Sequence, residues 1–404
     1  MRFEGGRRCR YVLAVLVVGI LLIGNSSASK MRILHEFTGG ADGGEPNGTL
    51  AIDGLGNVYG VAPAGGTGNA GVVFELSPSS NGWRETVLYN FTGGTDGSEP
   101  ESGLIIDATG NLFGTTGFGG TGCGVLFELL NQSGAWNYQV LHTFSNSDGC
   151  YPRGSGLVFD TSGNLYGVAG GGGTGGGGTV FELSPAGTDA WNFAVLHSFV
   201  GGYDGDDPWG QLAVAPDGTL YGTTVYGGPY VSDAGTVFKV ANSGGVWTES
   251  TIYSFTGGNN GSNPTGGVIL NAAGHLLGTT SGGGTDEVGT VFELVPTIGI
   301  WQLHTLHNFT AGPDGAVPAA SLVFDKRGNL YSTTGGGGLF QYGTLFRMTV
   351  KGQNWSEFVV HSFSNGKDGG TPAGPPLIDK SGRLYGTAES GGTFGQGVVY
   401  LVMP

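Results

Sequence analysis

Residues 104–144 read LIIDATGNLFGTTGFGGTGCGVLFELLNQSGAWNYQVLHTF, and the rest of the chain repeats this pattern. The Trp and Phe near the end of the stretch recur as a pair, and successive Phe positions differ by 53 to 56 residues. The pairs are Trp83/Phe91, Trp136/Phe144, Trp191/Phe199, Trp247/Phe255, Trp301/Phe309 and Trp355/Phe363, and Phe37 stands alone before them. A period this regular predicts a repeat architecture.

Glycine is unusually abundant, with 85 residues in a chain of 404, about three times the usual share of roughly 7%. The glycines fall in turns between short alternating apolar runs, which is typical of all-β proteins. Each repeat holds four such runs, and in the quoted copy they are 104–107, 111–115, 124–129 and 136–144. We call them strands A to D.

Strands A and B are joined by the motif D-x-x-G-N, as at Asp107, Gly110 and Asn111. Asp can bond the backbone two residues further on and Gly supplies a positive φ, so the motif predicts a hairpin turn rather than a carboxylate ligand. An antiparallel four-stranded unit cannot bury both faces alone, whereas units stacked around an axis can. The sequence therefore predicts an all-β, seven-bladed β-propeller, a single domain over residues 31–404. A parallel β-solenoid is the alternative, although its coils are shorter and lack these hairpins.

The A–B–C triplet occurs seven times, but strand D with its Trp occurs only six times. Residues 33–37 read ILHEF and match the end of strand D. We therefore predict that this N-terminal strand joins the last blade and closes the ring.

Residues 1–28 differ from the repeats. Four Arg residues precede the apolar run 11–24, and Ser26 and Ala28 stand at the −3 and −1 positions of a cleavage site. This predicts a secretory signal peptide and a secreted, extracellular or cell-surface protein. An uncleaved membrane anchor is the alternative, but the apolar run is short for a span of about 20 residues.

The formal charge of −15 becomes near −18 once the leader, with four Arg and one Glu, is removed. Such a charge argues against nucleic acid and anionic membranes as partners. We expect a monomer with no membrane span in the mature chain.

The units GNLFGTT…GVLFEL…W…VLHTF and GNLYGVAGGGG…GTVFELSP…W…VLHSF resemble the GloVer repeat of secreted bacterial proteins, across residues 31–404. The resemblance implies a secreted or surface protein and carries no catalytic residues over to this chain. The D-x-x-G-N-L-Y run also resembles strands A and B of NHL-type propellers.

Five of the seven His residues occupy one repeated position, two before the strand-D Phe: His35, His142, His197, His307 and His361. One residue per blade is spread around a ring, so we expect these side chains to pack between blades rather than bind a metal. No cofactor is expected, with Ca²⁺ at Asp204 and Asp206 as a lesser alternative. Cys123 and Cys150 are the only cysteines after the leader, and they are predicted to form a disulfide in an oxidising compartment.

The residue after the Pro of the D–A connection varies from copy to copy and precedes the innermost strand, so it is expected at the mouth of the channel. Trp209 is the one Trp outside strand D, and Asp206 and Asp207 precede it. An aromatic ring, an Arg and several polar groups suit a polar ligand such as a glycan, or a protein partner. The predicted ligand-binding residues are Asn47, Glu101, Arg153, Asp207, Trp209 and Thr265. Alternatively, Trp209 plugs the channel or packs on the neighbouring blade.

Two classes of function remain. One is a non-enzymatic binding module, and the other is an extracellular lyase or hydrolase acting on a polysaccharide or other polar substrate at the same face. An enzyme predicts a carboxylate, His or Tyr with a perturbed pKa in a deep pocket. No acid–base pair is visible in the sequence and no catalytic residue can be named, which favours the binding module.

Overall fold

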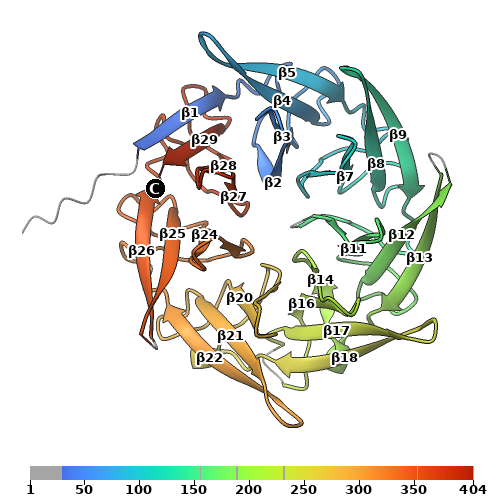
Figure 1. Cartoon of the computed structure of the whole chain (residues 1–404), viewed down its shortest axis with the longest axis vertical. Helices are drawn as coiled ribbons and strands as arrows, with labels where there is room; N and C mark the ends of the chain where they lie inside the picture. Colours follow the sequence, from blue (N-terminus) through green and yellow to red (C-terminus); the bar gives the residue numbers. More distant parts are fainter. Residues whose placement is uncertain (1–29, 155, 188–189, 231–232, 353, 404) are drawn as a thin grey trace, which may run out of the picture.

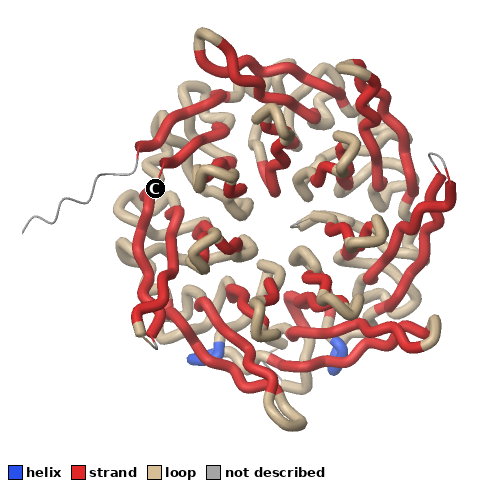
Figure 2. The backbone as a smooth tube through the Cα atoms, in the orientation of Figure 1, coloured by secondary structure: helices blue, strands red, loops and turns tan. Residues whose placement is uncertain are grey.

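The computed structural model describes residues 30–403, apart from 155, 188–189, 231–232 and 353. Seven antiparallel sheets stand around a central axis (Figure 1), and the predicted seven-bladed β-propeller is confirmed. Within these residues the only helices are the two short 3₁₀ turns η1 (Gly202–Asp204) and η2 (Gly258–Asn260), as Figure 2 shows. No described helix is long and apolar enough to cross a membrane. The predicted signal peptide, residues 1–28, lies outside the described residues.

Each blade has a short inner strand near the axis and longer strands toward the rim. The strands are, blade by blade, β2–β5 (Asn47–Ile52, Val58–Ala62, Val72–Ser79, Gly82–Asn90), β6–β9 (Ile105–Ile106, Leu112–Thr115, Val125–Gln132, Ala135–Thr143), β10–β13 (Val158–Phe159, Leu165–Ala169, Thr179–Gly187, Ala190–Ser198), β14–β18 (Asp206–Pro208, Ala213–Val214, Leu220–Tyr226, Thr236–Ser243, Val246–Ser254), β19–β22 (Ile269–Leu270, Leu276–Thr280, Thr290–Pro296, Trp301–Asn308), β23–β26 (Val323–Phe324, Leu330–Thr334, Thr344–Lys351, Asn354–Ser362), and β27–β29 (Leu377–Ile378, Leu384–Ala388, Val398–Met403) with β1 (Lys30–Glu36). In blade four the inner strand is split, since β14 and β15 both pair with β16.

The ring is closed as predicted. Strand β1 pairs with β29 in antiparallel register, from Lys30 opposite Met403 to Glu36 opposite Val398. Phe37, which follows β1, is fully buried and its ring lies 5.2 Å from that of Phe74 in blade one. The N-terminal strand therefore joins the last blade to the first.

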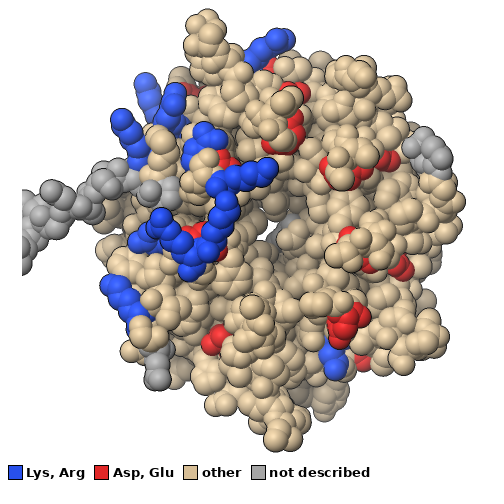
Figure 3. Space-filling model, viewed as in Figure 1, with Lys and Arg blue, Asp and Glu red and all other residues tan. Residues whose placement is uncertain are grey.

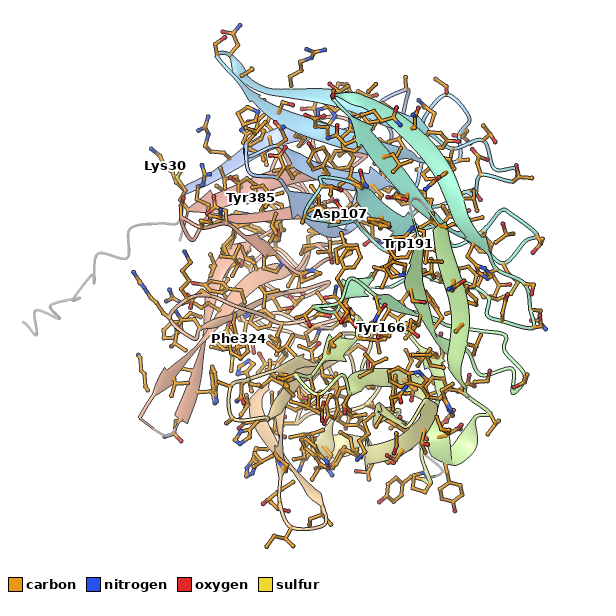
Figure 4. The ribbon with its side chains drawn as sticks, turned by 45° about the vertical axis from the view of Figure 1, so that its right-hand side comes forward. Lys30, Asp107, Tyr166, Trp191, Phe324 and Tyr385 are labelled. Carbon is orange, nitrogen blue, oxygen red and sulfur yellow. A yellow bond between two sulfur atoms is a disulfide. The ribbon has the colours of Figure 1, made fainter. Side chains whose placement is uncertain are left out.

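The repeated aromatic residues form the contacts between blades. The strand-D Phe packs on the strand-C Phe of the next blade, as Phe91 does on Phe127 with ring centroids 5.4 Å apart. The strand-D Trp packs backward on the aromatic residue of strand B in the preceding blade. Trp191, labelled in Figure 4, contacts Phe113 in this way at 5.6 Å. Because these contacts recur in almost every copy, the period seen in the sequence is the period of blade packing.

The D-x-x-G-N motif makes turns, as predicted. The Asp53 carboxylate accepts hydrogen bonds from the backbone N–H groups of Leu55 and Asn57 and from the Asn57 side chain. Asp160 and Asp325 make the same bonds in their own turns. The carboxylates of these motifs are therefore used to build the hairpins.

Each of the repeated His side chains has an acidic partner that was not predicted from the sequence. In every case His Nε2 lies 3.0–3.4 Å from a carboxylate oxygen of the following D–A loop. The pairs are His35–Asp42, His142–Asp148, His197–Asp204, His307–Asp314 and His361–Asp368. Tyr89, at the equivalent position of blade one, donates to Asp96 instead. His142 also stacks on Phe193 of the next blade, with ring centroids 3.6 Å apart, so the predicted packing between blades is confirmed for this residue.

The residue before the D–A Pro has a positive φ in all seven blades, although none of the seven is Gly: Glu45, Glu99, Tyr151, Asp207, Asn263, Val317 and Thr371. Its N–H donates to a carbonyl of the preceding blade, as Val317 does to Val288 at 2.8 Å. The inter-blade bond thus holds a conformation that is unfavourable for most L-residues.

We expect Val317→Asn to raise the free energy of unfolding by about 1 kcal/mol, because Asn tolerates the left-handed region far better than a β-branched residue does. Asn263 already occupies the equivalent position in blade five. Urea denaturation would measure the gain. The reverse change, Asn263→Val, should lower stability by at least as much, and a loss in both variants would show that the backbone conformation is not the cause.

Candidate functional site

A cavity of about 240 Å³ lies at the axis, where the B–C and D–A loops surround the channel. Its walls come from six of the seven blades, because residues of the D–A loops converge here. Three of the predicted ligand-binding residues, Asn47, Glu101 and Trp209, line it. Trp209 therefore lies at the channel mouth and belongs to the cavity wall.

Arg153 links these lining residues. Its guanidinium carbon lies 5.3 Å from the centre of the Trp209 ring, 5.2 Å from that of Tyr151 and 5.7 Å from that of Phe118. Its Nη1 lies 3.9 Å from Oε2 of Glu101. The Nε atom of Arg153 is buried and has no hydrogen-bond partner within the described part of the chain. The Arg153 guanidinium thus lies among three aromatic rings and one carboxylate, and its Nε–H is not used in a hydrogen bond to any described residue.

The position of Trp209 depends on Gly154. This glycine has φ +100°, and a Cβ atom there would lie 2.1 Å from the carbonyl oxygen of Trp209. Any side chain at this position would displace the backbone of Trp209. The glycine that follows Arg153 therefore lets blade three approach blade four at the mouth.

Two other predicted residues, Asp207 and Thr265, are not among the residues that line this cavity. Asp207 rests against Gly170, where a Cβ atom would be 2.5 Å from its Oδ1. Burial, with a smaller effect of Asp206, raises the pKa of Asp207 to about 6, while Arg153 opposes the shift. Thr265 does not line the cavity, and its hydroxyl is buried without a partner among the described residues. The structure thus gathers Asn47, Glu101, Arg153 and Trp209 and leaves Thr265 outside this group.

Glu389 also lines the cavity, although it was not among the residues predicted from the sequence. Burial raises its pKa to about 7, and the negative charges of Glu45 and Glu101 add to the rise. Burial likewise raises the pKa of Glu101, against the effect of Arg153. The sequence does mark Glu389 as a departure from the repeat. No other copy has a carboxylate at the equivalent position, which is Pro63, Gly117, Gly170, Val225, Ser281 or Gly335. The carboxylate is therefore not needed to build a blade.

The family model described as the Gloeobacter/Verrucomicrobia repeat matches residues 19–230, 121–302 and 215–404. The chain belongs to this family. A search of curated proteins finds no match.

Solved structures share the fold of this Gloeobacter/Verrucomicrobia repeat protein at low identity. The extracellular domain described as part of a hybrid two-component system of B. thetaiotaomicron aligns with TM-score 0.57 and 10% identity, covering 92% of this chain and 39% of that one. A puromycin-hydrolyzing peptidase of Mycobacterium tuberculosis aligns with TM-score 0.52 and 11% identity, covering 86% and 50%. Identities this low show a common fold and nothing about activity.

A disulfide ties the site of the Gloeobacter/Verrucomicrobia repeat protein to its scaffold. Cys123 in the B–C loop of blade two is bonded to Cys150 in the D–A loop that leaves the same blade. The N–H of Tyr151 donates to the carbonyl of Cys123 at 3.1 Å. The covalent link therefore anchors the segment that carries Tyr151 and Arg153.

The acidic cluster near Trp209 is arranged as a turn. Asp204 Oδ2 lies 3.4 Å from Nε2 of His197, and Asp206 begins β14. Among the described residues, no three His, Cys, Asp or Glu side chains are grouped so that they could hold a metal ion. The structure gives no support to the alternative of Ca²⁺ at Asp204 and Asp206.

Proposed function

We propose that this chain is a secreted or cell-surface binding module that holds a polar ligand, such as a glycan, at the channel mouth. The observation that carries the proposal is the placement of Arg153 against Trp209, beside the cavity that Asn47 and Glu101 also line. An aromatic face beside a few convergent polar groups suits the apolar and polar faces of a sugar. Arg and Trp are also the residue types that dominate binding energy at protein interfaces.

The extracellular location rests on independent features. The leader has the pattern of a secretory signal, and a disulfide is typical of oxidising compartments. The similar structure from B. thetaiotaomicron is itself described as an extracellular domain.

A glycan array followed by calorimetric titration of the best ligand would test the binding site. We expect Trp209→Ala to weaken the affinity at least tenfold, because Trp209 lines the cavity and its ring packs on Arg153. Tyr203→Ala is the matched control, since Tyr203 is 76% exposed on the same D–A loop and does not line the cavity. Equal affinities of the parent and Trp209→Ala, with the fold intact by circular dichroism, would refute the site.

A hydrolase or lyase acting at the same place is the second candidate, and Glu389 is the observation that favours it. A carboxyl with a pKa of about 7 in the same cavity as a second carboxyl, Glu101, meets one requirement of general acid–base catalysis. If the protein is an enzyme, it should degrade a glycan that it binds, and Glu389→Gln should abolish turnover while binding persists. A bound glycan that stays intact over days would exclude this candidate for that ligand.

A further inference from the structure

The cations of this acidic chain are concentrated in one sector. Four of the 16 Lys and Arg residues precede residue 30, and nine of the remaining 12 belong to β1 and blades six and seven: Lys30, Arg32, Lys326, Arg327, Arg347, Lys351, Lys367, Lys380 and Arg383. Figure 3 shows Lys and Arg side chains gathered on one side of the ring, while acidic groups are spread around the rest of that face. The net charge of −15 therefore conceals a local positive surface.

The repeats show that these cations are not required by the fold. The A–B turns of blades one to five, residues 54–57, 108–111, 161–164, 216–219 and 272–275, contain neither Lys nor Arg. The corresponding turns of blades six and seven carry Lys326, Arg327, Lys380 and Arg383. All seven turns close with the same backbone hydrogen bonds, so Lys326, Arg327 and Lys380 are not needed to form them. Arg383 differs, because it replaces the Asn of the motif and donates to Asp379.

Arg347 in strand C also departs from the commonest residue of the repeat, as Lys239 does in blade four. At its position in strand C, blades one, two, three and five have Glu75, Glu128, Glu182 and Glu293. In blade six the charge is reversed, and the guanidinium lies over the Phe358 ring, 5.4 Å from its centre. The Nε atom of Arg347 is buried and lacks a hydrogen-bond partner in the described part of the chain. Arg347 is also one of the residues that line the groove between blades six and seven.

These side chains surround a groove between blades six and seven, with a volume of about 290 Å³. Its lining includes Lys326, Arg327, Arg347 and Lys380, together with Tyr331 and Ile378. The turns of the two blades touch here, because Nζ of Lys326 donates to the carbonyl of Lys380 at 2.9 Å. Cations from two blades thus meet beside an aromatic and an aliphatic side chain.

Two carboxylates also line the groove, but both serve their own turns. Asp325 accepts from the N–H groups of Arg327 and Asn329 and from the Asn329 side chain. Asp379 accepts from Ser381 and from the backbone and Nε of Arg383. Both carboxylates are hydrogen-bonded within their own turns, and the lining has four cationic side chains against these two anionic ones. The groove therefore carries a net positive charge.

We propose that this groove binds a linear anionic glycan whose carboxylate or sulfate groups pair with Lys326, Arg327, Arg347 and Lys380. Guanidinium and ammonium groups are strong donors to such anions, and Tyr331 and Ile378 offer an apolar surface to a sugar ring. The groove lies at the A–B turns, at the opposite end of the strands from the Trp209 cavity. It is a second site, independent of the function proposed for the channel mouth.

Affinity electrophoresis and biolayer interferometry would test the site, with heparin as the sulfated probe, polygalacturonate as the carboxylated probe and dextran as a neutral one. We expect the processed protein to bind at least one anionic polymer and not dextran, and the binding to weaken from 50 to 300 mM NaCl as charge pairs are screened. Absence of binding to both anionic polymers, or equal binding to dextran, would overturn the proposal.

Variants separate the groove from the overall charge. Lys326→Ala/Arg327→Ala/Lys380→Ala should weaken the apparent Kd at least tenfold. Arg84→Ala/Lys239→Ala/Lys367→Ala, which removes the same charge from residues that do not line the groove, should change it less than twofold. Arg347→Glu restores the residue of four other copies and should also abolish binding without loss of fold. Equal effects of the two triple variants would contradict the site.

Two further measurements distinguish the groove from the channel mouth and from a membrane-docking surface. Trp209→Ala should leave heparin binding unchanged, whatever it does at the channel mouth. Vesicles of anionic phosphatidylglycerol should compete poorly with the polymer, and binding to vesicles without binding to either anionic glycan would overturn the proposal in favour of membrane docking.

Discussion

Deleting residues 30–37 is expected to destabilise the propeller by more than about 5 kcal/mol or to prevent folding. The deletion removes β1 from β29 and takes away Phe37, which is fully buried between the last blade and the first. Loss of a buried Phe alone costs about 3–5 kcal/mol. The freed edge of β29 also exposes unpaired backbone groups, which favours aggregation.

Thermal melting with size-exclusion chromatography would measure the effect. Phe37→Ala should reproduce part of the loss, and His35→Tyr should be mild, because Tyr89 and Tyr253 occupy the same position in other copies. A synthetic peptide of residues 30–37 added to the truncated protein should restore stability if ring closure is the cause. A truncated protein that melts like the parent and stays monomeric would rule out this role.

The contribution of three Glu residues to the stability of the protein should fall from pH 5 to pH 8. Glu85, Glu249 and Glu357 each lie two residues after a strand-D Trp. Burial raises the pKa of each to about 7, and the charge of Asp42, Asp204 or Asp314 in the preceding blade adds to the rise. The folded state therefore favours the protonated carboxyls. Their contribution to stability is fully present below the unfolded pKa near 4.5 and is lost as the pH rises through 7.

The variant Glu85→Gln/Glu249→Gln/Glu357→Gln should gain roughly 1–2 kcal/mol per residue over the parent at pH 8, allowing for partial exposure, and almost nothing at pH 4.5. The neighbouring His35, His197 and His307 act in the opposite direction, because burial lowers their pKa and protonation at low pH destabilises the fold. They are unchanged in the variant, so the difference between the two proteins isolates the Glu residues. Urea denaturation at both pH values would measure it.

Asp286→Asn/Glu287→Gln is the control, because both residues are exposed in a loop of blade five. This control variant should show no comparable gain in the free energy of unfolding at pH 8 relative to pH 4.5. A triple variant whose advantage is the same at pH 4.5 and pH 8 would show that the burial of these carboxyls has no effect on titration.

Most of the architecture could be predicted because its determinants are local and repeated. The Asp53 turn is specified within five residues, and the spacing of Trp136 and Phe144 recurs wherever a blade packs on its neighbour. Ring closure could also be predicted from the sequence, since Phe37 matches the strand-D Phe but has no Trp before it.

The candidate site was harder to predict because it is assembled from different blades. Glu101 and Trp209 could be named as departures from the repeat, and the structure places both at one cavity. Glu389 is the same kind of departure, but it belongs to a B–C loop and becomes relevant only where that loop meets the D–A loop of Glu101. Thr265 follows the same sequence rule as Trp209 and still lies outside the cavity lining.

The sequence by itself determined the seven-fold repeat, the hairpins and the closing strand, because each depends on hydrogen bonding and side-chain alternation over a few residues. Only the tertiary structure decided which carboxyls are desolvated, as with Glu85 and Glu389, and which cations meet, as with Lys326 and Lys380. Desolvation and charge pairing depend on distances between different blades, as for Lys326 and Lys380, which are 54 residues apart in the chain. Those distances exist only when the ring is closed.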